Sequence, residues 1–327
     1  MSRIHVFLMA LVLVTTALLP SAALSADPTV EVLPGPGTGD RERSIPLTRS
    51  QLRSVAARER QAGQVVASFP TPGGKAGAPE LAAAALCPTN AVTAAALEAR
   101  TTAARASGAA DPFGATAEGR IDAVAASGNC VSDFVSIYPR QQVKWFYCGP
   151  ATVQQVINYT RGIFSSNQGV NWFTQQQISD WWLKADANGG TSPYMERVGM
   201  NAGSKLPAGF IYMEHRVTSG ADWHGHVITD VTGWNMPLTA AVAPRDVGFN
   251  FFLQSWENSA PVNTGHWIVM RGYFGKWDGT RGPLVYYTDS SGGAGGSTGR
   301  FYDPSYDVYQ TLIKTNKVHT QGKWIVW

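Results

Sequence analysis

The sequence predicts an α+β fold for the C-terminal part of the chain, with a helical part packed on an antiparallel β-sheet. The first observation is a helical repeat of apolar residues, Val153, Val156 and Ile157, directly after a Cys-Gly-Pro turn. The second is a pair of β-type runs, 266–273 and 284–289, whose linker contains the turn formers Asp-Gly and Gly-Pro. A helix layer on a sheet layer can bury one shared core.

The N-terminal residues 1–26 have the pattern of a secretory signal peptide. Arg3 is basic, an apolar run extends from Phe7 to Leu19, and small residues precede Ala26. A membrane anchor is the alternative, but the run is shorter than the roughly 20 residues that a spanning helix needs. We therefore expect a secreted, extracellular protein that has no membrane association after signal removal.

Residues 27–130 are rich in Pro, Gly and Ala, and are expected to form a pro-segment or accessory region that is partly disordered. Within this region, helices are predicted over Ser50 to Ala67 and over Leu81 to Ala106. The aromatic part of the chain follows, because all 11 Trp residues lie at or after Trp145. The chain therefore has an N-terminal half without Trp and an aromatic C-terminal half.

The overall charge is weak. Charged residues make up 15% of the chain and the formal net charge is +3, whereas hydrophobic residues make up 44%. Such a balance does not favour a nucleic-acid partner or an anionic membrane surface, and it is ample for a packed core. No cofactor is expected.

The chain has 3 cysteines, Cys87, Cys130 and Cys148. In an exported protein a pair of thiols tends to form a disulfide, and an odd cysteine needs a separate reason. We pair Cys87 with Cys130, both of which lie in turn-like contexts, and this leaves Cys148 free. A Cys130–Cys148 disulfide, or an inert buried Cys148, is the alternative.

Cys148 precedes Gly149 and Pro150 at the predicted start of a helix. Pro suits the first turn, where its missing N–H would be unpaired in any case. The N-terminus of a helix favours an anion, and the thiolate is the reactive form of cysteine. Cys148 is therefore a candidate nucleophile, and Gly149 would let a substrate approach the backbone closely.

A cysteine nucleophile needs a base and a group that orients the base. His266 opens the first β-type run and Asp289 ends the second. If the two runs form an antiparallel hairpin, the imidazole and the carboxylate come side by side, as in a catalytic triad. The alternatives are a core histidine and a turn-capping carboxylate.

These residues resemble the bacteriocin-processing peptidase-like family of papain-like cysteine peptidases, which includes the double-glycine leader peptidases. The resemblance covers about 131–327. It rests on Gln142 six positions before Cys148, on a Gly265-His266-Trp267 strand, and on a following strand that ends in Asp289. It implies a papain-like fold, a peptide or protein substrate and no metal. It also implies that Cys148 is the nucleophile, His266 the general base, Asp289 its orienting group and Gln142 an oxyanion donor, with Gly149, Gly265 and Trp267 near the substrate.

The chain departs from this family in spacing. The separations from Cys148 to His266 and from His266 to Asp289 are both long, and we expect the extra residues within 185–262. The sequence shows no ATP-binding cassette and no transmembrane domain, so a role in leader-peptide export does not transfer. Two other functions stay open: a cell-wall amidase or transglutaminase-type acyl transferase on the same site, and a non-catalytic binding protein of the same fold.

Two other patterns have two interpretations each. Asp222, His224, His226 and Asp230 could supply metal ligands, because Zn²⁺ binds His and carboxylate groups. No second cluster completes such a site, so we expect a strand with outward polar residues and no metal. The aromatic pairs Trp172-Phe173 and Trp181-Trp182 could line a substrate cleft or belong to the core.

Overall fold

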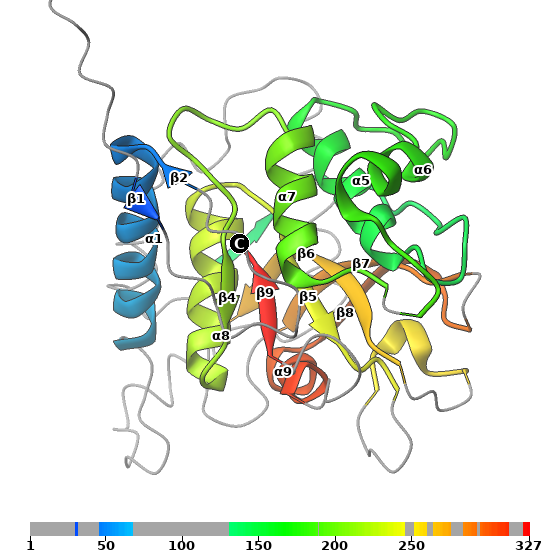
Figure 1. Ribbon diagram of the computed structural model, residues 1–327. Helices are drawn as coiled ribbons and strands as arrows, with labels where there is room; N and C mark the ends of the chain where they lie inside the picture. Colours follow the sequence, from blue (N-terminus) through cyan, green and yellow to red (C-terminus); the bar gives the residue numbers. More distant parts are fainter. Residues whose placement is uncertain are drawn as a thin grey trace, which may run out of the picture.

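The structure is a computed structural model that describes residues 30–31, 46–67, 131–188, 190–245, 252–259, 264–275, 284–292, 295–313 and 323–327 (Figure 1). The strands are β1 (Val30–Glu31), β2 (Pro46–Leu47), β3 (Val131–Phe134), β4 (Glu214–Arg216), β5 (Leu238–Val242), β6 (His266–Gly275), β7 (Leu284–Ser290), β8 (Thr298–Pro304) and β9 (Trp324–Val326). The helices are α1 (Arg49–Ala67), α5 (Cys148–Thr160), α6 (Gln175–Ile178), η1 (Ser179–Leu183), α7 (Pro193–Gly203), α8 (Gly220–Val227), η2 (Ile228–Gly233), η3 (Gln254–Trp256) and α9 (Ser305–Ile313).

The main sheet has seven strands, and every strand pairing in it is antiparallel. Its strand order is β4-β9-β5-β6-β7-β8, and β3 adds a further pairing to β6. The predicted hairpin is present, because β6 pairs with β7 directly. The α+β class, with helices on an antiparallel sheet, is thereby confirmed.

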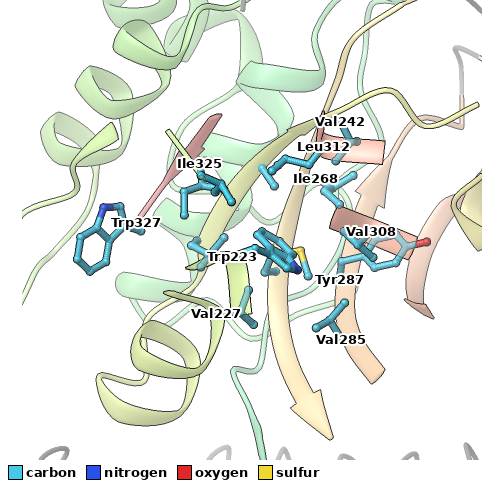
Figure 2. Close-up of a cluster of buried hydrophobic side chains, with 14 of the residues drawn as sticks. Trp223, Val227, Val242, Ile268, Val285, Tyr287, Val308, Leu312, Ile325 and Trp327 are labelled. Carbon is cyan, nitrogen blue, oxygen red and sulfur yellow. The ribbon is translucent and has the colours of Figure 1, made fainter. Parts of the chain in front are cut away.

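Alternating side chains of β6 serve two cores, one on each face of the sheet. Ile268 and Met270 belong to a core that α8 and α9 cover, and Figure 2 shows part of it. Trp267 and Val269 belong to the other core, which also holds the apolar residues of α5. The predicted helical repeat Val153, Val156 and Ile157 is buried there. Since both faces are covered, the β6 run is apolar almost throughout.

The helix predicted over 50–67 is confirmed as α1, which packs against α8 and η2 at one side of the molecule (Figure 1). Leu47 is fully buried in the core under α8 and α9, and Leu52 and Val55 pack on that core. Arg58 of α1 is also fully buried. This part of the N-terminal region therefore shares a core with residues 131–327.

Several expectations are corrected or lie outside the described residues. Residues 223–226, expected to form a strand, belong to helix α8, whose N-cap Ser219 accepts a hydrogen bond from Asp222 N. Segment 185–262 contributes β4, β5, α7 and α8 to the body of the fold. The signal peptide, the predicted helix 81–106 and the Cys87–Cys130 pair all lie outside the described residues. Within those residues, no helix is both long and apolar enough to cross a membrane.

Candidate active site

Cys148 is a free thiol at the first residue of α5. The residue is 8% exposed, and its N-cap neighbour Tyr147 provides no side-chain capping hydrogen bond. The first N–H groups of a helix have no partner within the helix, and together with the helix dipole they favour an anion at this end. The position of Cys148 thus suits a thiolate.

His266 and Asp289 lie side by side, as the hairpin predicted. Nε2 of His266 is 2.7 Å from Oδ1 of Asp289, and both side chains are buried. The His266 ring also interacts with Cys148 through charge and a side-chain hydrogen bond. Because Nε2 is engaged with Asp289, Nδ1 is the ring nitrogen left to face the thiol. The structure therefore brings the three predicted residues together in the order Cys148, His266, Asp289.

The charges of this group stabilise one another. Burial alone would lower the pKa of His266, but the Asp289 carboxylate and the Cys148 thiol raise it to about 10. Burial would likewise raise the pKa of Asp289, but the charge and hydrogen bond of His266 hold that pKa below its usual value. The Asp289 carboxylate is thus the main group that favours a proton on His266.

A β-bulge in β6 sets the relative position of His266 and Asp289. The register shifts by one residue between Met270 and Gly272. Before the bulge, Met270 pairs with Tyr287, and the same register extended to His266 places residue 291 across from it. Residue 291 lies two positions after Asp289, and side chains two residues apart lie on the same face of a strand. His266 and Asp289 therefore share a face of the sheet. If the register after the bulge extended to His266, residue 292 would lie across from it, and the side chains of His266 and Asp289 would point to opposite faces of the sheet.

Two residues that the sequence reasoning missed hold the Asp289 carboxylate. Ser255 Oγ donates to Oδ2 over 2.7 Å, and Trp256 Nε1 donates to the same oxygen over 3.1 Å. The backbone N–H of Ser291 donates to Oδ1 over 2.8 Å. Ser255 and Trp256 lie on η3, and no motif marks them in the sequence. Asp289 is thus a buried carboxylate whose lone pairs are satisfied while it faces His266.

Gln142 lies in the loop before α5, and its backbone N–H donates to Ser290 O at the end of β7 over 2.9 Å. Its side-chain amide donates to the carbonyl oxygens of Lys144 over 3.2 Å and Trp145 over 2.7 Å. The amide therefore shapes the loop that leads into Cys148. A role as oxyanion donor requires at least one of these hydrogen bonds to be exchanged for substrate, and it stays a prediction.

The three predicted substrate contacts have different environments. Gly265 is exposed beside His266. Trp267 is 3% exposed, and its indole N–H donates to Thr191 O over 3.0 Å, so packing rather than substrate contact accounts for its position. Gly149 is buried, and a Cβ at this residue would lie 2.3 Å from Oγ1 of Thr191. Close packing against Thr191 is thus a reason for glycine at 149 that the sequence did not reveal.

Replacing Gly149 with alanine is expected to lower the free energy of unfolding by about 1–3 kcal/mol, because the new methyl group overlaps the buried Thr191 side chain. A Gly149→Ala/Thr191→Gly double variant should recover much of this loss. Gly63 is a matched control, since it lies in α1 with nothing within 4 Å of its missing Cβ. Chemical denaturation measures all three, and an unchanged Gly149→Ala variant would contradict the packing argument.

A second buried carboxyl, that of Glu196, lies near Cys148. Burial raises its pKa well above the usual value, the hydrogen bond with Thr152 opposes this rise, and the charge of Cys148 adds to it. Oγ1 of Thr152 lies 2.5 Å from Glu196 Oε1 and 2.8 Å from Gly149 O. The Thr152 hydroxyl thus links the buried Glu196 carboxyl to the first turn of α5.

The candidate metal residues of 222–230 separate in the structure. Nδ1 of His224 lies 2.8 Å from Ser305 Oγ, and Asp230 forms an ion pair with Arg58. Asp222 and His226 stay together, with 3.3 Å between Oδ1 and Nε2.

The aromatic pairs also divide between surface and core. Trp172 and Trp181 are 50% and 53% exposed. Their neighbours Phe173 and Trp182 pack on the core that contains α5.

Comparison with known proteins does not assign the chain to a family. No family model matches the sequence, and no curated protein matches it. Among solved structures, digestive procathepsin L 3 from the larval midgut of Tenebrio molitor is similar over 77% of this chain and 96% of its own, at 14% identity and a TM-score of 0.27. A likeness this weak carries no argument, so the functional case depends on the site itself.

Proposed function

We propose that this protein is a secreted cysteine peptidase of papain-like fold, related to the bacteriocin-processing peptidases, that hydrolyses peptide bonds. One observation carries the proposal: the His266 ring is bonded to Asp289 at 2.7 Å and also interacts with Cys148 at the start of α5. Nucleophile, base and orienting group in this order make up the arrangement used for acyl transfer by cysteine.

In the proposed reaction, the Cys148 sulfur attacks the carbonyl carbon of the scissile bond and forms a tetrahedral oxyanion. His266, which holds the thiol proton, donates it to the leaving amine as the C–N bond breaks. Water then attacks the thioester, gives up a proton to His266, and releases the acid as Sγ leaves. Asp289 keeps the ring oriented and stabilises its charged form throughout.

The substrate proposed is a peptide or protein, bound where the loop before α5 meets the start of β6. Val143 and Trp145 of that loop are 69% and 62% exposed, so apolar surface is available beside Cys148. Gly265 would allow an extended backbone to pass close to His266. Gln142 would donate to the oxyanion, and donors of this kind are worth about 3 kcal/mol each.

The proposal is tested by alkylation of Cys148 with iodoacetamide across pH, with the modified peptide identified by mass spectrometry. We expect rapid reaction of Cys148 below about pH 7, where an ordinary thiol with a pKa of about 8.5 reacts slowly. A His266→Ala variant should lose this reactivity because the imidazolium that stabilises the thiolate is gone. An inert or disulfide-bonded Cys148 in the secreted protein would rule out every enzyme reading of the site.

A second assay separates the reactions that share an acyl-enzyme. The secreted protein is incubated with a peptide library and, in parallel, with purified peptidoglycan peptides. Cleavage of library peptides that is lost in Cys148→Ala supports a peptidase. Turnover of cell-wall peptides alone, or transfer to added amines, would replace the peptidase with an amidase or transglutaminase-type enzyme.

A further inference from the structure

A second cluster of titratable side chains joins three elements that are distant in sequence. Glu59 lies on α1, His215 on β4 and His226 on α8. Oε1 of Glu59 is 3.7 Å from Nδ1 of His215, and its Oε2 is 4.0 Å from Nε2 of His226. One ligand atom from each residue lies within 4.8 Å of the other two. A nitrogen of each imidazole and an oxygen of the carboxylate are therefore close enough to share one ion.

Asp222 holds His215 in the orientation that such an ion requires. Its two oxygens lie 3.2 and 3.1 Å from Nε2 of His215, and they leave Nδ1 directed at Glu59. Asp222 is itself fixed, since Thr218 donates to it from its backbone N–H over 2.7 Å and from its hydroxyl over 2.9 Å. Metal-binding histidines usually bind the ion through one ring nitrogen and form a hydrogen bond to a carboxylate through the other.

Two carboxylates flank the buried His226 ring. Asp222 Oδ1 lies 3.3 Å from its Nε2, and Glu59 Oε2 lies 4.0 Å from the same nitrogen. The His226 side chain is 1% exposed, whereas that of Glu59 is 45% exposed. A divalent ion between them would face both carboxylates, and Nε2 of His226 would give up its contact with Asp222 to bind it.

We propose that Glu59, His215 and His226 bind a Zn²⁺ ion, and that this ion fastens α1 to the body of the fold. Two imidazole nitrogens and one carboxylate oxygen are a ligand set that Zn²⁺ accepts at about 2.0–2.2 Å. At these bond lengths tetrahedral ligand atoms lie about 3.3–3.6 Å apart, so the 3.7 and 4.0 Å separations to Glu59 must shorten by about 0.7 Å or less, and the Glu59 side chain can supply that movement. The two imidazole nitrogens, which lie within 4.8 Å of each other, must reach the same spacing. The fourth position is open to water. The site lies on elements other than α5, β6 and β7, and it does not depend on the proposed peptidase activity.

The experiment uses the full chain with Cys148 replaced by alanine, so that zinc cannot bind the Cys148–His266 pair. Zinc affinity and stoichiometry are measured by competition with a fluorescent chelator, and melting temperature is followed with and without zinc. We expect one zinc per chain and a rise in Tm of about 5 °C at one hundred times Kd, reversed by EDTA. Zinc should also slow hydrogen exchange of the α1 amides.

Three variants test which carboxylates contribute to zinc binding. Glu59→Gln should abolish the Tm rise, and since the Glu59 side chain is 45% exposed this variant should still fold. Asp222→Asn should weaken zinc binding about 10–100-fold, which is the usual effect of losing a carboxylate that orients a metal-binding histidine. Glu257→Gln removes an exposed carboxylate elsewhere and should change nothing. Equal zinc binding by Glu59→Gln and the parent chain, or no effect of zinc on the parent, would overturn the proposal.

Discussion

Replacement of His266 by alanine is expected to lower kcat/KM on a cleaved peptide by a factor of about a thousand or more. General acid–base catalysis by a positioned side chain contributes about 10²–10⁴-fold, and in the proposed reaction His266 also takes the proton of the Cys148 thiol. Steady-state kinetics on the best library peptide measures the loss. Because His266 and Asp289 act as a unit, His266→Ala/Asp289→Asn should be little slower than His266→Ala alone.

The pH profile makes this prediction specific. The pKa of His266 is raised to about 10, so its acid form is nearly complete below about pH 8 and is lost as pH rises through about 10. The alkaline limb of kcat/KM should therefore lie near pH 10. Asp289→Asn removes the main cause of the raised pKa and should move that limb to lower pH. An alkaline limb that stays in place would show that Asp289 does not act on catalysis through His266.

Replacement of Arg58 by methionine is expected to lower the free energy of unfolding by about 3–5 kcal/mol, the usual effect of removing one partner of a buried ion pair. Arg58 is fully buried in α1, and its Nε lies 3.4 Å from Oδ1 of Asp230. Its Nη1 donates to Ile211 O over 2.6 Å, and its guanidinium lies 4.1 Å from the ring centres of both Phe210 and Trp327. Chemical denaturation of the full chain measures the loss.

The loss should depend on pH in a defined direction. Burial already raises the pKa of Asp230 to about 6, although Arg58 opposes the rise, so without Arg58 the pKa should move higher still. When the pKa of Asp230 is higher in the folded than in the unfolded state, the folded state binds more protons in the pH range between the two values. The free energy of unfolding of Arg58→Met should therefore fall as pH rises from about 4 through 6 and beyond.

Two further variants control the Arg58 prediction. Arg60→Met, at an exposed position two residues along α1, should change stability by less than about 0.5 kcal/mol. Arg58→Met/Asp230→Leu should recover part of the loss because no unpaired charge remains. If Arg58→Met unfolds like the parent chain, α1 is not part of the cooperative unit.

Local patterns predicted the elements that carry the candidate site. Apolar residues at helical spacing after Pro150 indicated α5, and the two β-type runs with a turn-forming linker indicated the β6–β7 hairpin. The hairpin then placed His266 beside Asp289, because antiparallel strands bring the start of one next to the end of the other. These predictions depend on short-range periodicity and on turn-forming residues, both of which are visible in a single sequence.

Contacts over long sequence distances could not be predicted in the same way. Ser255 and Trp256 support Asp289 from a 3₁₀ helix that no pattern announces, and Thr191 crowds Gly149 from the loop before α7. The alternation His224-Gly225-His226 predicts a strand, whereas the structure has helix α8 there. Ser219 caps this helix, and Trp223 and Val227, four residues apart, are both buried. The burial of Arg58 depends on partners more than 150 residues away.

The bulge between Met270 and Gly272 determines which changes of length the site can tolerate during divergence. An insertion between β6 and β7 that keeps the strand pairs on both sides of the bulge alters the separation of His266 and Asp289 in sequence and leaves their separation in space unchanged. A single residue gained or lost between His266 and the bulge, or in β7 between Tyr287 and Asp289, instead turns one side chain to the opposite face. In distant relatives, the residue count between His266 and the bulge should therefore persist while the His-to-Asp spacing varies, and searches that fix that spacing would miss them.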